Sequence, residues 1–512
     1  MSNSKIFGLM IDAARQPESL DTCKRIVDFA AAWRFNTVLF RVADDQGIAI
    51  KLDSVPELIK TPDAFAKSEI SELVKYAESK DILIIPEVES FGHTRYISDV
   101  PEFKRMRDVS EVSGATSGLC PVADGVLALM AKIYIEVSAL FRASYIHGGC
   151  DEVNWGGAQL SRQALQARSR DEIWSEYVNS LNAVAKSLNL QFMIWADHVL
   201  RKNPDTLEMI DRDIILLDWD YNVNKPEEIK PYLCRALEHG FKIIGAPAMF
   251  WGKWLLHIGA GQLRNISAWC EAFRTCENTA ALGVIITNWC PWRYLSNSYF
   301  DSAVFASVAF HEGYREAVNS AFRLFVEKHY RTEWNSDWKN LFVAAYAFMP
   351  PRFKSSHPME YPFIQTPWKN EETLREAFEL PDTSIPLEEA RLILKLCGKC
   401  STAVRFNKSD FESFHVSFKY FENIYSRIVL LQEMTDDNAA KAIQNISEKD
   451  RLILNELEKI WNKTRNPGSM MKREYAPHTS GGQQIWVEMY EAAEYSSRLT
   501  PAQLKKIIRK NK

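Results

Sequence analysis

Eight short apolar runs alternate with amphipathic helical stretches between residues 5 and 312. This order predicts an α/β fold, a (β/α)8 TIM barrel over residues 1–315. The apolar runs are nearly continuous, which indicates strands buried on both faces, as in a parallel sheet. A doubly wound open sheet would also alternate, but it rarely needs eight units, and no G-x-G-x-x-G follows the first run.

The predicted strands share a β-rich, apolar composition. They cover residues 5–12, 37–42, 82–88, 145–149, 191–197, 213–221, 242–248 and 283–289. Between them, apolar residues recur at helical spacing, which predicts helices at 19–33, 67–80, 123–141, 171–188, 225–238 and 264–278. The number and order of these elements match one barrel.

Beyond residue 315 the pattern becomes helical. A helix is predicted around 315–346, and the segment 350–386 holds seven of the chain's 21 prolines, so it is predicted to be irregular. Apolar stripes at helical spacing follow at 421–431 and 454–461. Residues 316–512 are therefore predicted to form a mostly α-helical C-terminal domain, with the aromatic residues of the stripes in its core.

Composition argues against several classes of partner. The formal net charge of −4 gives no reason to expect nucleic acid or an anionic membrane as a partner. No apolar run at the start of the sequence suggests a signal peptide, and none reaches the roughly 20 residues of a membrane span. Nine scattered cysteines favour reduced thiols over a disulfide framework. These observations together predict a cytoplasmic protein.

Catalytic groups of TIM-barrel enzymes lie at the C-terminal ends of the strands and in the loops that follow. At those positions the sequence places carboxylates, one arginine, histidines and aromatic residues, which we expect to surround a single mouth. They are Asp12, Arg15, Glu87, Glu89, His93, His147, Asp151, Glu152, Trp195, Asp197, Asp218, Trp219, Tyr221, Asn288 and Trp289.

The end of the fourth strand carries the sharpest signal. Two glycines that allow a close backbone approach precede the adjacent acids Asp151 and Glu152. An Asp-Glu pair in an ordinary loop is a solvated surface feature, but this pair follows a core strand directly. Because neighbouring side chains point in different directions, one carboxylate can donate a proton while the other orients or charges another part of a substrate.

The segment HGGCDEV at 147–153 resembles the signature of glycoside hydrolase family 20, the β-N-acetylhexosaminidases. Similar segments follow the order of the family along the barrel, over roughly residues 6–312. The chain looks most similar to the hexosaminidase D-like branch, in which no small α+β domain precedes the barrel. The matching segments are GLMIDAAR at 8–15, PEVESFGHT at 86–94, IWAD at 194–197, DWDY at 218–221 and TNW at 287–289.

The resemblance implies a role for each matching residue. Glu152 would act as general acid and then base, while Asp151 would hold the 2-acetamido group, whose oxygen is the nucleophile and forms an oxazolinium ion. The resemblance implies Tyr221 as a hydrogen-bond donor to the acetamido oxygen and Arg15 as a bidentate donor to sugar hydroxyls. The remaining substrate-binding residues would be His93, Trp195, Asp197, Trp219 and Trp289, with His147 in support.

Two readings of the supporting residues stay open. His147 is either a core histidine or a support for the site, and Asp197 is either a helix N-cap or an acetamido-side partner. Many family members carry a Trp-x-Glu after the eighth strand, but residues 289–294 here read WCPWRY. The preference between GlcNAc and GalNAc therefore stays open, and Arg293 or another residue could take the place of the missing acid.

The expected partner is a glycan or glycoconjugate with a terminal N-acetylhexosamine, and a homodimer is possible. No cofactor and no metal are expected, because the chain lacks H-E-x-x-H and clustered histidines. Two other functions remain open. One is a catalytically silent sugar-binding barrel. The other is a retaining glycosidase that forms a covalent intermediate through two separated carboxylates, such as Glu89 and Glu152.

Overall fold

The computed structural model describes residues 5–114, 116–251, 256–348, 370–378, 383–433, 438–465 and 485–511. The chain divides into two compact units. Unit 1 comprises residues 1–249, 262–289 and 306–317, and unit 2 comprises residues 250–261, 290–305 and 318–512. Both units therefore contain segments that are not contiguous in the sequence.

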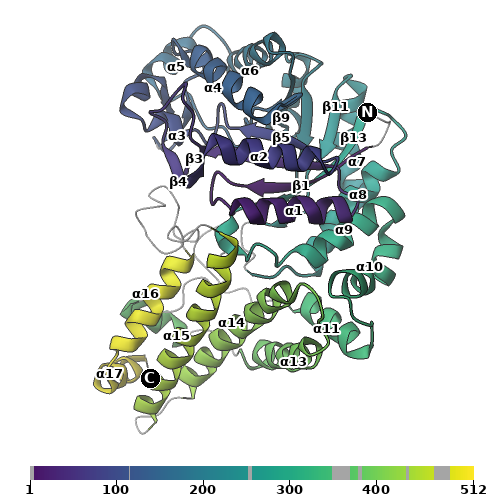
Figure 1. The fold of residues 1–512 in the computed structure, drawn as a ribbon. Helices are drawn as coiled ribbons and strands as arrows, with labels where there is room; N and C mark the ends of the chain where they lie inside the picture. The colour runs from purple at the N-terminus through teal and green to yellow at the C-terminus, as the bar shows by residue number, and fades with distance from the viewer. Residues whose placement is uncertain are drawn as a thin grey trace. The chain divides into compact units, whose positions relative to one another are not determined.

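Eight parallel strands of unit 1 form a closed barrel (Figure 1). Each pairs in parallel with the next along the chain, and β13 pairs with β1 to close the ring. All eight predicted strands are confirmed. They are β1 (Ile6–Asp12), β2 (Thr37–Asp44), β5 (Leu83–Val88), β8 (Tyr145–His147), β9 (Gln191–Trp195), β10 (Ile215–Asp218), β11 (Lys242–Gly245) and β13 (Ala281–Asn288).

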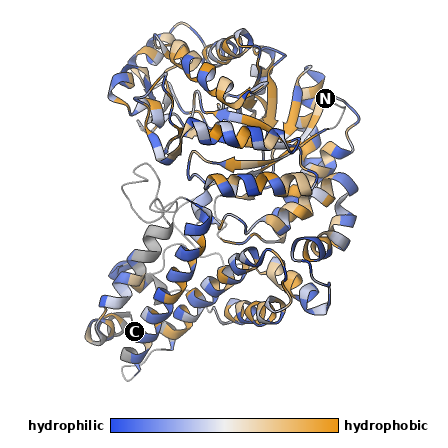
Figure 2. Ribbon diagram, viewed as in Figure 1, coloured by the Kyte–Doolittle hydropathy of each residue, from blue (hydrophilic) through white to orange (hydrophobic). Residues whose placement is uncertain are grey.

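The strands are apolar and buried along nearly their whole length, while the helices carry apolar residues on one side and polar residues on the other (Figure 2). Two of the helices begin at side-chain caps. Ser19 caps the N-terminus of α1, and Ser169 forms a capping box with Glu172 at the N-terminus of α6. The helices between the strands are α1 (Leu20–Ala32), α2 (Lys67–Glu78), α4 (Val126–Phe141), α6 (Arg170–Ser187), α7 (Pro226–Glu238) and α8 (Ala260–Arg274), and α9 (Phe300–Glu312) follows the last strand.

Short elements that the apolar pattern does not predict lie in the loops of the barrel. After β2 the chain forms β3 (Gly47–Ile50) and β4 (Lys60–Phe65), and an antiparallel pair, β6 (Arg107–Val109) and β7 (Thr116–Leu119), follows β5. The others are α3 (Arg95–Ser98), η1 (Pro101–Met106), α5 (Gln159–Ala164), η2 (Asp197–Lys202), η3 (Pro204–Glu208), β12 (Ala248–Phe250) and η4 (Pro291–Arg293).

Beyond the barrel the described elements are helices, as expected. The single helix predicted around 315–346 is wrong, because the chain forms two helices, α10 (Tyr314–His329) and α11 (Ser336–Ala347). Arg331 is left-handed between them, and the Asn335 side chain caps α11. The others are α12 (Glu371–Phe378), α13 (Ser384–Ser401), α14 (Lys408–Gln432), α15 (Ala439–Thr464), α16 (Ile485–Arg498) and α17 (Pro501–Asn511).

The apolar stripes predicted for unit 2 face its core. Phe421 and Ile428 of α14 and Leu457 and Trp461 of α15 are buried. Much of the proline-rich segment predicted at 350–386 lies outside the described residues. Within the part of the chain that the structure describes, no helix combines the length and the apolar character that a membrane crossing needs.

Candidate active site

The loop after β8 adopts an unusual backbone. Gly149, Cys150 and Glu152 all have positive φ angles, of 69°, 73° and 47°. A side chain at position 149 would collide with Glu89, because a Cβ there would lie 1.9 Å from Glu89 Oε2. Glycine is therefore required at this position. The loop stores backbone strain where the two adjacent acids follow the strand, a feature that is common at active sites.

The two acids occupy different environments. The Asp151 side chain is 11% exposed and the Glu152 side chain is 58% exposed. Asp151 Oδ1 is buried and has no hydrogen-bond partner among the described residues. Asp151 is thus positioned to meet a polar group inside the pocket, whereas Glu152 remains accessible to a substrate that enters from solvent.

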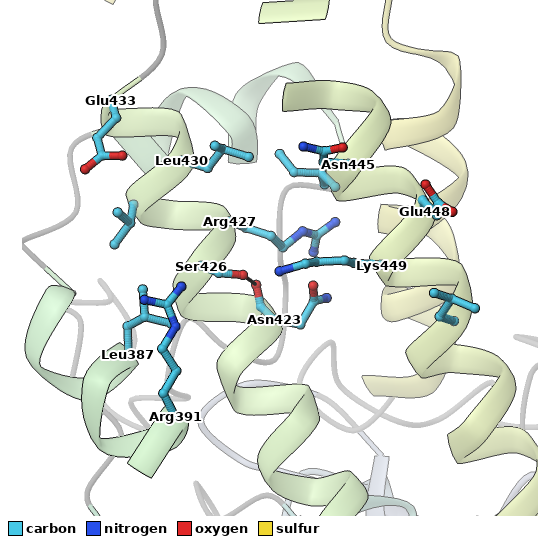
Figure 3. Close-up of a pocket in the computed structure, with 13 residues that line it drawn as sticks. Leu387, Arg391, Asn423, Ser426, Arg427, Leu430, Glu433, Asn445, Glu448 and Lys449 are labelled. Carbon is cyan, nitrogen blue, oxygen red and sulfur yellow. Dashed lines mark hydrogen bonds between the residues drawn. The ribbon is translucent and has the colours of Figure 1, made fainter. Parts of the chain in front are cut away.

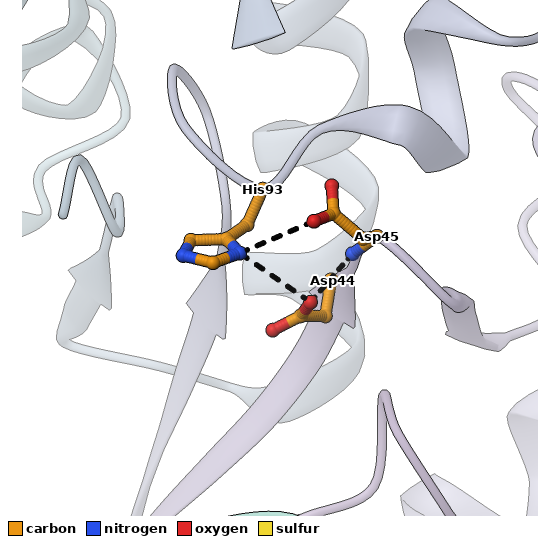
Figure 4. Close-up of side chains that lie close together, drawn as sticks. All are labelled: Asp44, Asp45 and His93. Atoms are coloured by element: carbon orange, nitrogen blue, oxygen red, sulfur yellow. Dashed lines mark hydrogen bonds and ion pairs between the residues drawn. The ribbon is translucent and has the colours of Figure 1, made fainter. Parts of the chain in front are cut away.

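His93, in the loop after β5, lies between the two acids and a second acidic pair. Its Nε2 lies 3.6 Å from Asp151 Oδ2 and 3.4 Å from Glu152 Oε2, and its Nδ1 lies 3.3 Å from Asp45 Oδ2 and 3.8 Å from Asp44 Oδ1 (Figure 4). Burial alone would lower the pKa of His93, but the surrounding carboxylates raise it well above its ordinary value. The four carboxylates therefore favour the protonated form of His93.

The side chains around His93 also include atoms of the kind that bind metal ions. Two groups bring ligand-type atoms within 4.8 Å of one another, namely Asp44, Asp45 and His93, and His93, Asp151 and Glu152. A protonated imidazole cannot ligate a metal ion. In the structure the His93 ring lies within 3.8 Å of all four carboxylates.

Glu152 is held through both its side chain and its main chain. The hydrogen bond from His93 is the largest influence on its pKa and lowers it, and the positive charges of Lys202 and Arg15 act in the same direction. Its main-chain N–H donates to Asp197 Oδ2 at 3.2 Å. Asp197 therefore acts on the backbone of the acid pair, and the N-cap of η2 is Ala196 rather than Asp197.

An internal network beneath the acids was missed by the sequence analysis. Arg41, near the end of β2, is fully buried, donates to Asp44 and to Glu89 at 2.8 Å each, and pairs with Glu87. Glu89 accepts the Cys150 N–H at 3.2 Å and hydrogen-bonds Asp151. Burial and the nearby Asp151 charge raise the pKa of Glu89 well above its ordinary value, although the Arg41 charge lowers it.

Arg15 lies at the mouth, as expected. Its Nη1 lies 3.1 Å from Asp12 Oδ2 and its Nη2 lies 2.9 Å from Asp44 Oδ2, with the guanidinium carbon 5.2 Å from the ring centre of Trp289. The two carboxylates fix the plane of the guanidinium group. The position of Asp44 at the end of β2 is the same strand-end signal that identified the other site residues, and it could have been found by that rule.

Aromatic side chains form a wall beside the acids. Trp195 and Trp289 lie 5.5 Å apart between ring centres, and the Trp289 Nε1–H donates to the Tyr221 hydroxyl at 2.7 Å. Trp219 stacks on Tyr221 at 5.2 Å. The Asp151 and Glu152 charges raise the pKa of Tyr221 in addition to burial, which places this hydroxyl within electrostatic range of the acids. The structure thus brings these four predicted residues together.

His147 packs against Trp195 and hydrogen-bonds the loop that carries the two acids. It is fully buried, its ring centre lies 4.6 Å from that of Trp195, and its Nδ1 accepts the Gly149 N–H at 3.0 Å. Burial lowers its pKa to about 3, so it is neutral at physiological pH. His147 is both a core residue and a support for the loop that carries the acids.

A separate cavity of about 520 Å³ lies in unit 2 and is lined from α13, α14 and α15 (Figure 3). Its cationic side chains already have acidic neighbours: Arg391 bonds Glu388, Arg427 bonds Asp450, and Lys449 lies 4.0 Å from Glu422. These ion pairs stabilise the contacts between the helices. The chemistry that the sequence predicts belongs to unit 1.

Comparison with known proteins gives one consistent family. The family model for the catalytic domain of glycosyl hydrolase family 20 matches residues 7–289. The chain is 26% identical to hexosaminidase D of Bos taurus over 276 residues, which cover 49% of this chain and 77% of that protein. It is 24% identical to a beta-hexosaminidase of Vibrio furnissii over 253 residues, or 42% of this chain and 40% of that protein.

The fold is similar to that of solved structures. The crystal structure of a beta-N-acetylhexosaminidase from Bacteroides fragilis superposes with a TM-score of 0.50 and 18% identity, over 60% of this chain and 66% of that one. At this identity the likeness concerns the fold. The chain matches about two fifths of the length of the Vibrio furnissii relative.

Proposed function

The match to the glycosyl hydrolase family 20 model covers more than half of the chain, so this protein belongs to that family, and we propose that it is a retaining exo-β-N-acetylhexosaminidase. The proposed substrate is a glycan or glycoconjugate that ends in β-linked GlcNAc or GalNAc. The observation that carries the proposal is the adjacent pair Asp151 and Glu152, with His93 between their carboxylates.

Glu152 is the proposed proton donor. In the first step its protonated carboxyl gives a proton to the glycosidic oxygen while the acetamido oxygen attacks the anomeric carbon, so the bond to the leaving group breaks and an oxazolinium ion forms. In the second step the Glu152 carboxylate takes a proton from water as the water oxygen bonds to the anomeric carbon, and the bond from that carbon to the acetamido oxygen breaks, which regenerates the acetamido group. Two displacements restore the original configuration.

Asp151 is proposed to orient the acetamido group. Its buried Oδ1 has no partner among the described residues and can accept the acetamido N–H, and its negative charge stabilises the developing oxazolinium. The Tyr221 hydroxyl, which accepts from Trp289, is proposed to donate a hydrogen bond to the acetamido oxygen of a bound substrate. The tryptophan wall supplies the apolar contact for the acetamido methyl and the sugar face.

The geometry disfavours the mechanism with a covalent intermediate through Glu89. That carboxyl is fully buried, accepts hydrogen bonds from Arg41 and the Cys150 N–H, and hydrogen-bonds Asp151. A fully buried carboxyl whose two oxygens already accept hydrogen bonds is a poor nucleophile. A silent sugar-binding protein would keep the pocket, but it would not need the accessible carboxylate of Glu152.

The proposal is tested with the nitrophenyl glycosides of β-GlcNAc, β-GalNAc and plain β-glucose, on the wild type and on Glu152→Gln. We expect cleavage only of the N-acetylated substrates, and a loss of about 10²- to 10⁴-fold in kcat for the variant. The ratio of the first two rates gives the sugar preference.

An inhibitor separates the two retaining mechanisms. A thiazoline that mimics the oxazoline is expected to bind tightly, because the pocket is complementary to the intermediate. Equal cleavage of the plain glucoside together with no thiazoline inhibition would contradict acetamido assistance. Saturable binding of GlcNAc with no hydrolysis of any substrate would instead identify a sugar-binding protein.

A further inference from the structure

The short element η2, which follows β9, is a π-helical turn. Such turns are rare and occur frequently at functional sites. In an α-helix with 3.6 residues per turn, residues five apart point in different directions. The wider turn of η2 instead brings its last residue back to its first, so that Lys202 Nζ lies 2.7 Å from Asp197 Oδ2.

Asp197 links this turn to the catalytic loop. The same Oδ2 that accepts from Lys202 accepts the main-chain N–H of Glu152 at 3.2 Å. Asp197 is 3% exposed, and Glu152 has a left-handed φ of 47°, which is strained for a residue other than glycine. A hydrogen bond to a buried carboxylate is strong enough to hold this strained conformation.

The charge of Lys202 favours the ionised form of the linking carboxylate. The pKa of Asp197 is raised overall, because burial and the Asp151 charge raise it while the Lys202 charge lowers it. Without Lys202, burial and Asp151 would both favour a protonated Asp197, which is a weaker acceptor for the Glu152 N–H. The Lys202 side chain is 52% exposed, so its replacement does not leave a cavity in the hydrophobic core.

We propose that Lys202 is a positioning residue that acts through Asp197 to hold the Glu152 main chain in the strained orientation needed for proton donation. The inference rests on the function proposed above, since it gives a role to a residue beside the proposed acid. Lys202 itself makes no contact with the reacting atoms. It therefore affects kcat rather than the binding of the sugar.

The kinetic test compares Lys202→Met, Lys202→Arg and a matched control. Lys186→Met is the control, because it removes a Lys–Asp ion pair of 2.9 Å with Asp213, before β10 and hence at the opposite end of the barrel. For Lys202→Met we expect kcat to fall about 5- to 20-fold, with KM changed less than twofold. Lys202→Arg is expected to recover most of kcat, and Lys186→Met to match the wild type.

A pH profile distinguishes this role from a merely structural one. The charged groups that act on Glu152 are His93, Lys202 and Arg15, and Asp151 acts on Asp197. Removal of the Lys202 charge raises the pKa of Glu152, so the alkaline limb of kcat/KM moves to higher pH, by about half a unit. Unchanged limbs, or a kcat loss that Lys202→Arg does not reverse, would overturn the proposal.

A double-mutant cycle on unfolding needs no activity. Lys202→Met, Asp197→Asn and the double variant are compared by denaturant unfolding at pH 7. We expect the double variant to be less destabilised than the sum of the two single changes. Additive effects would overturn the Lys202–Asp197 link even in an active enzyme. Coupling in a protein that cleaves no substrate would refute only the proposed function.

Discussion

At the scale of single residues, the charge of His93 affects the protonation of the proposed acid, Glu152. This residue faces Asp44 and Asp45 on one side and Asp151 and Glu152 on the other. The contact lowers the pKa of Glu152 below the ordinary glutamate value of about 4.3. The free protein therefore carries an ionised Glu152 at neutral pH, although the proposed reaction starts from its protonated form.

A first prediction concerns the pH dependence of the wild type. Since kcat/KM reports groups of the free enzyme and Glu152 must be protonated, kcat/KM should fall as the pH rises above the lowered pKa of Glu152. We expect the alkaline limb to lie at lower pH than the ordinary glutamate pKa of about 4.3 would give. Initial rates on nitrophenyl β-GlcNAc at substrate concentrations far below KM, from pH 3 to 9, measure it. A flat profile up to pH 7 would contradict this assignment.

A second prediction concerns His93→Asn. The change removes the largest influence that lowers the pKa of Glu152, so the alkaline limb should move to higher pH. The lost orientation of both acids should reduce kcat/KM by about 10²- to 10³-fold. Rates for the variant and the wild type are compared across the same pH range. An unchanged limb with a large loss of rate would mean that His93 only shapes the pocket.

At the scale of secondary-structure elements, charged side chains fasten the loops of the barrel to its helices. Glu136 of α4 accepts the main-chain N–H groups of Asp53 and Ser54 at 2.9 and 2.8 Å and pairs with Lys67 at 2.9 Å. Burial alone would raise its pKa, but these donors lower it to about 2. One carboxylate thus connects α4, the loop after β3 and the start of α2.

A third prediction follows for Glu136→Gln. The folded-state pKa lies below the unfolded value of about 4.3, so the stabilisation is present above pH 4.3 and is lost as the pH falls towards 2. The variant should lose about 1–2 kcal/mol in the free energy of unfolding at pH 7, and less below pH 3. Urea unfolding at several pH values measures both. A deficit that does not depend on pH would exclude the ionised carboxylate as its cause.

At the scale of the whole molecule, the two units are interleaved along the chain. Residues 250–261 and 290–305 belong to unit 2 although barrel segments precede and follow them. Within unit 2, His257 packs on Phe414 and Phe418, and its Nε2 lies 3.0 Å from the carbonyl oxygen of Ala345. The early segments of unit 2 are therefore buried against residues much later in the sequence.

A fourth prediction concerns a chain cut after residue 315, the boundary that the sequence pattern suggests. The apolar residues of 250–261 and 290–305 would lose their partners in unit 2, so we expect the 1–315 fragment to aggregate or to unfold well below the full chain. Expression with size-exclusion chromatography and thermal unfolding tests this. A monomeric fragment with the melting temperature of the full chain would show that 315 is a true domain boundary.

The sequence by itself determined the order of the barrel and the position of its acids. Strands buried on both faces are continuous apolar runs, and this local signal located all eight strands. The strand-end rule then located Asp151 and Glu152, because parallel strands bring their carboxyl ends to one mouth. The sequence pattern indicated one helix where the structure has two, divided at the left-handed Arg331. The pattern missed this division because it does not reveal a change of backbone direction.

Only the tertiary structure decided how these residues act on one another. Arg41 and Lys202 carry no local signature, and they meet Glu89 and Asp197 because the ring closes and the π-helical turn of η2 folds back. Burial and opposing charges set their protonation states, and both depend on contacts between residues distant in the sequence. The interleaving of the two units also depends on contacts between distant residues. Sequence periodicity shows which face of an element is buried, but it does not show which other segment covers that face.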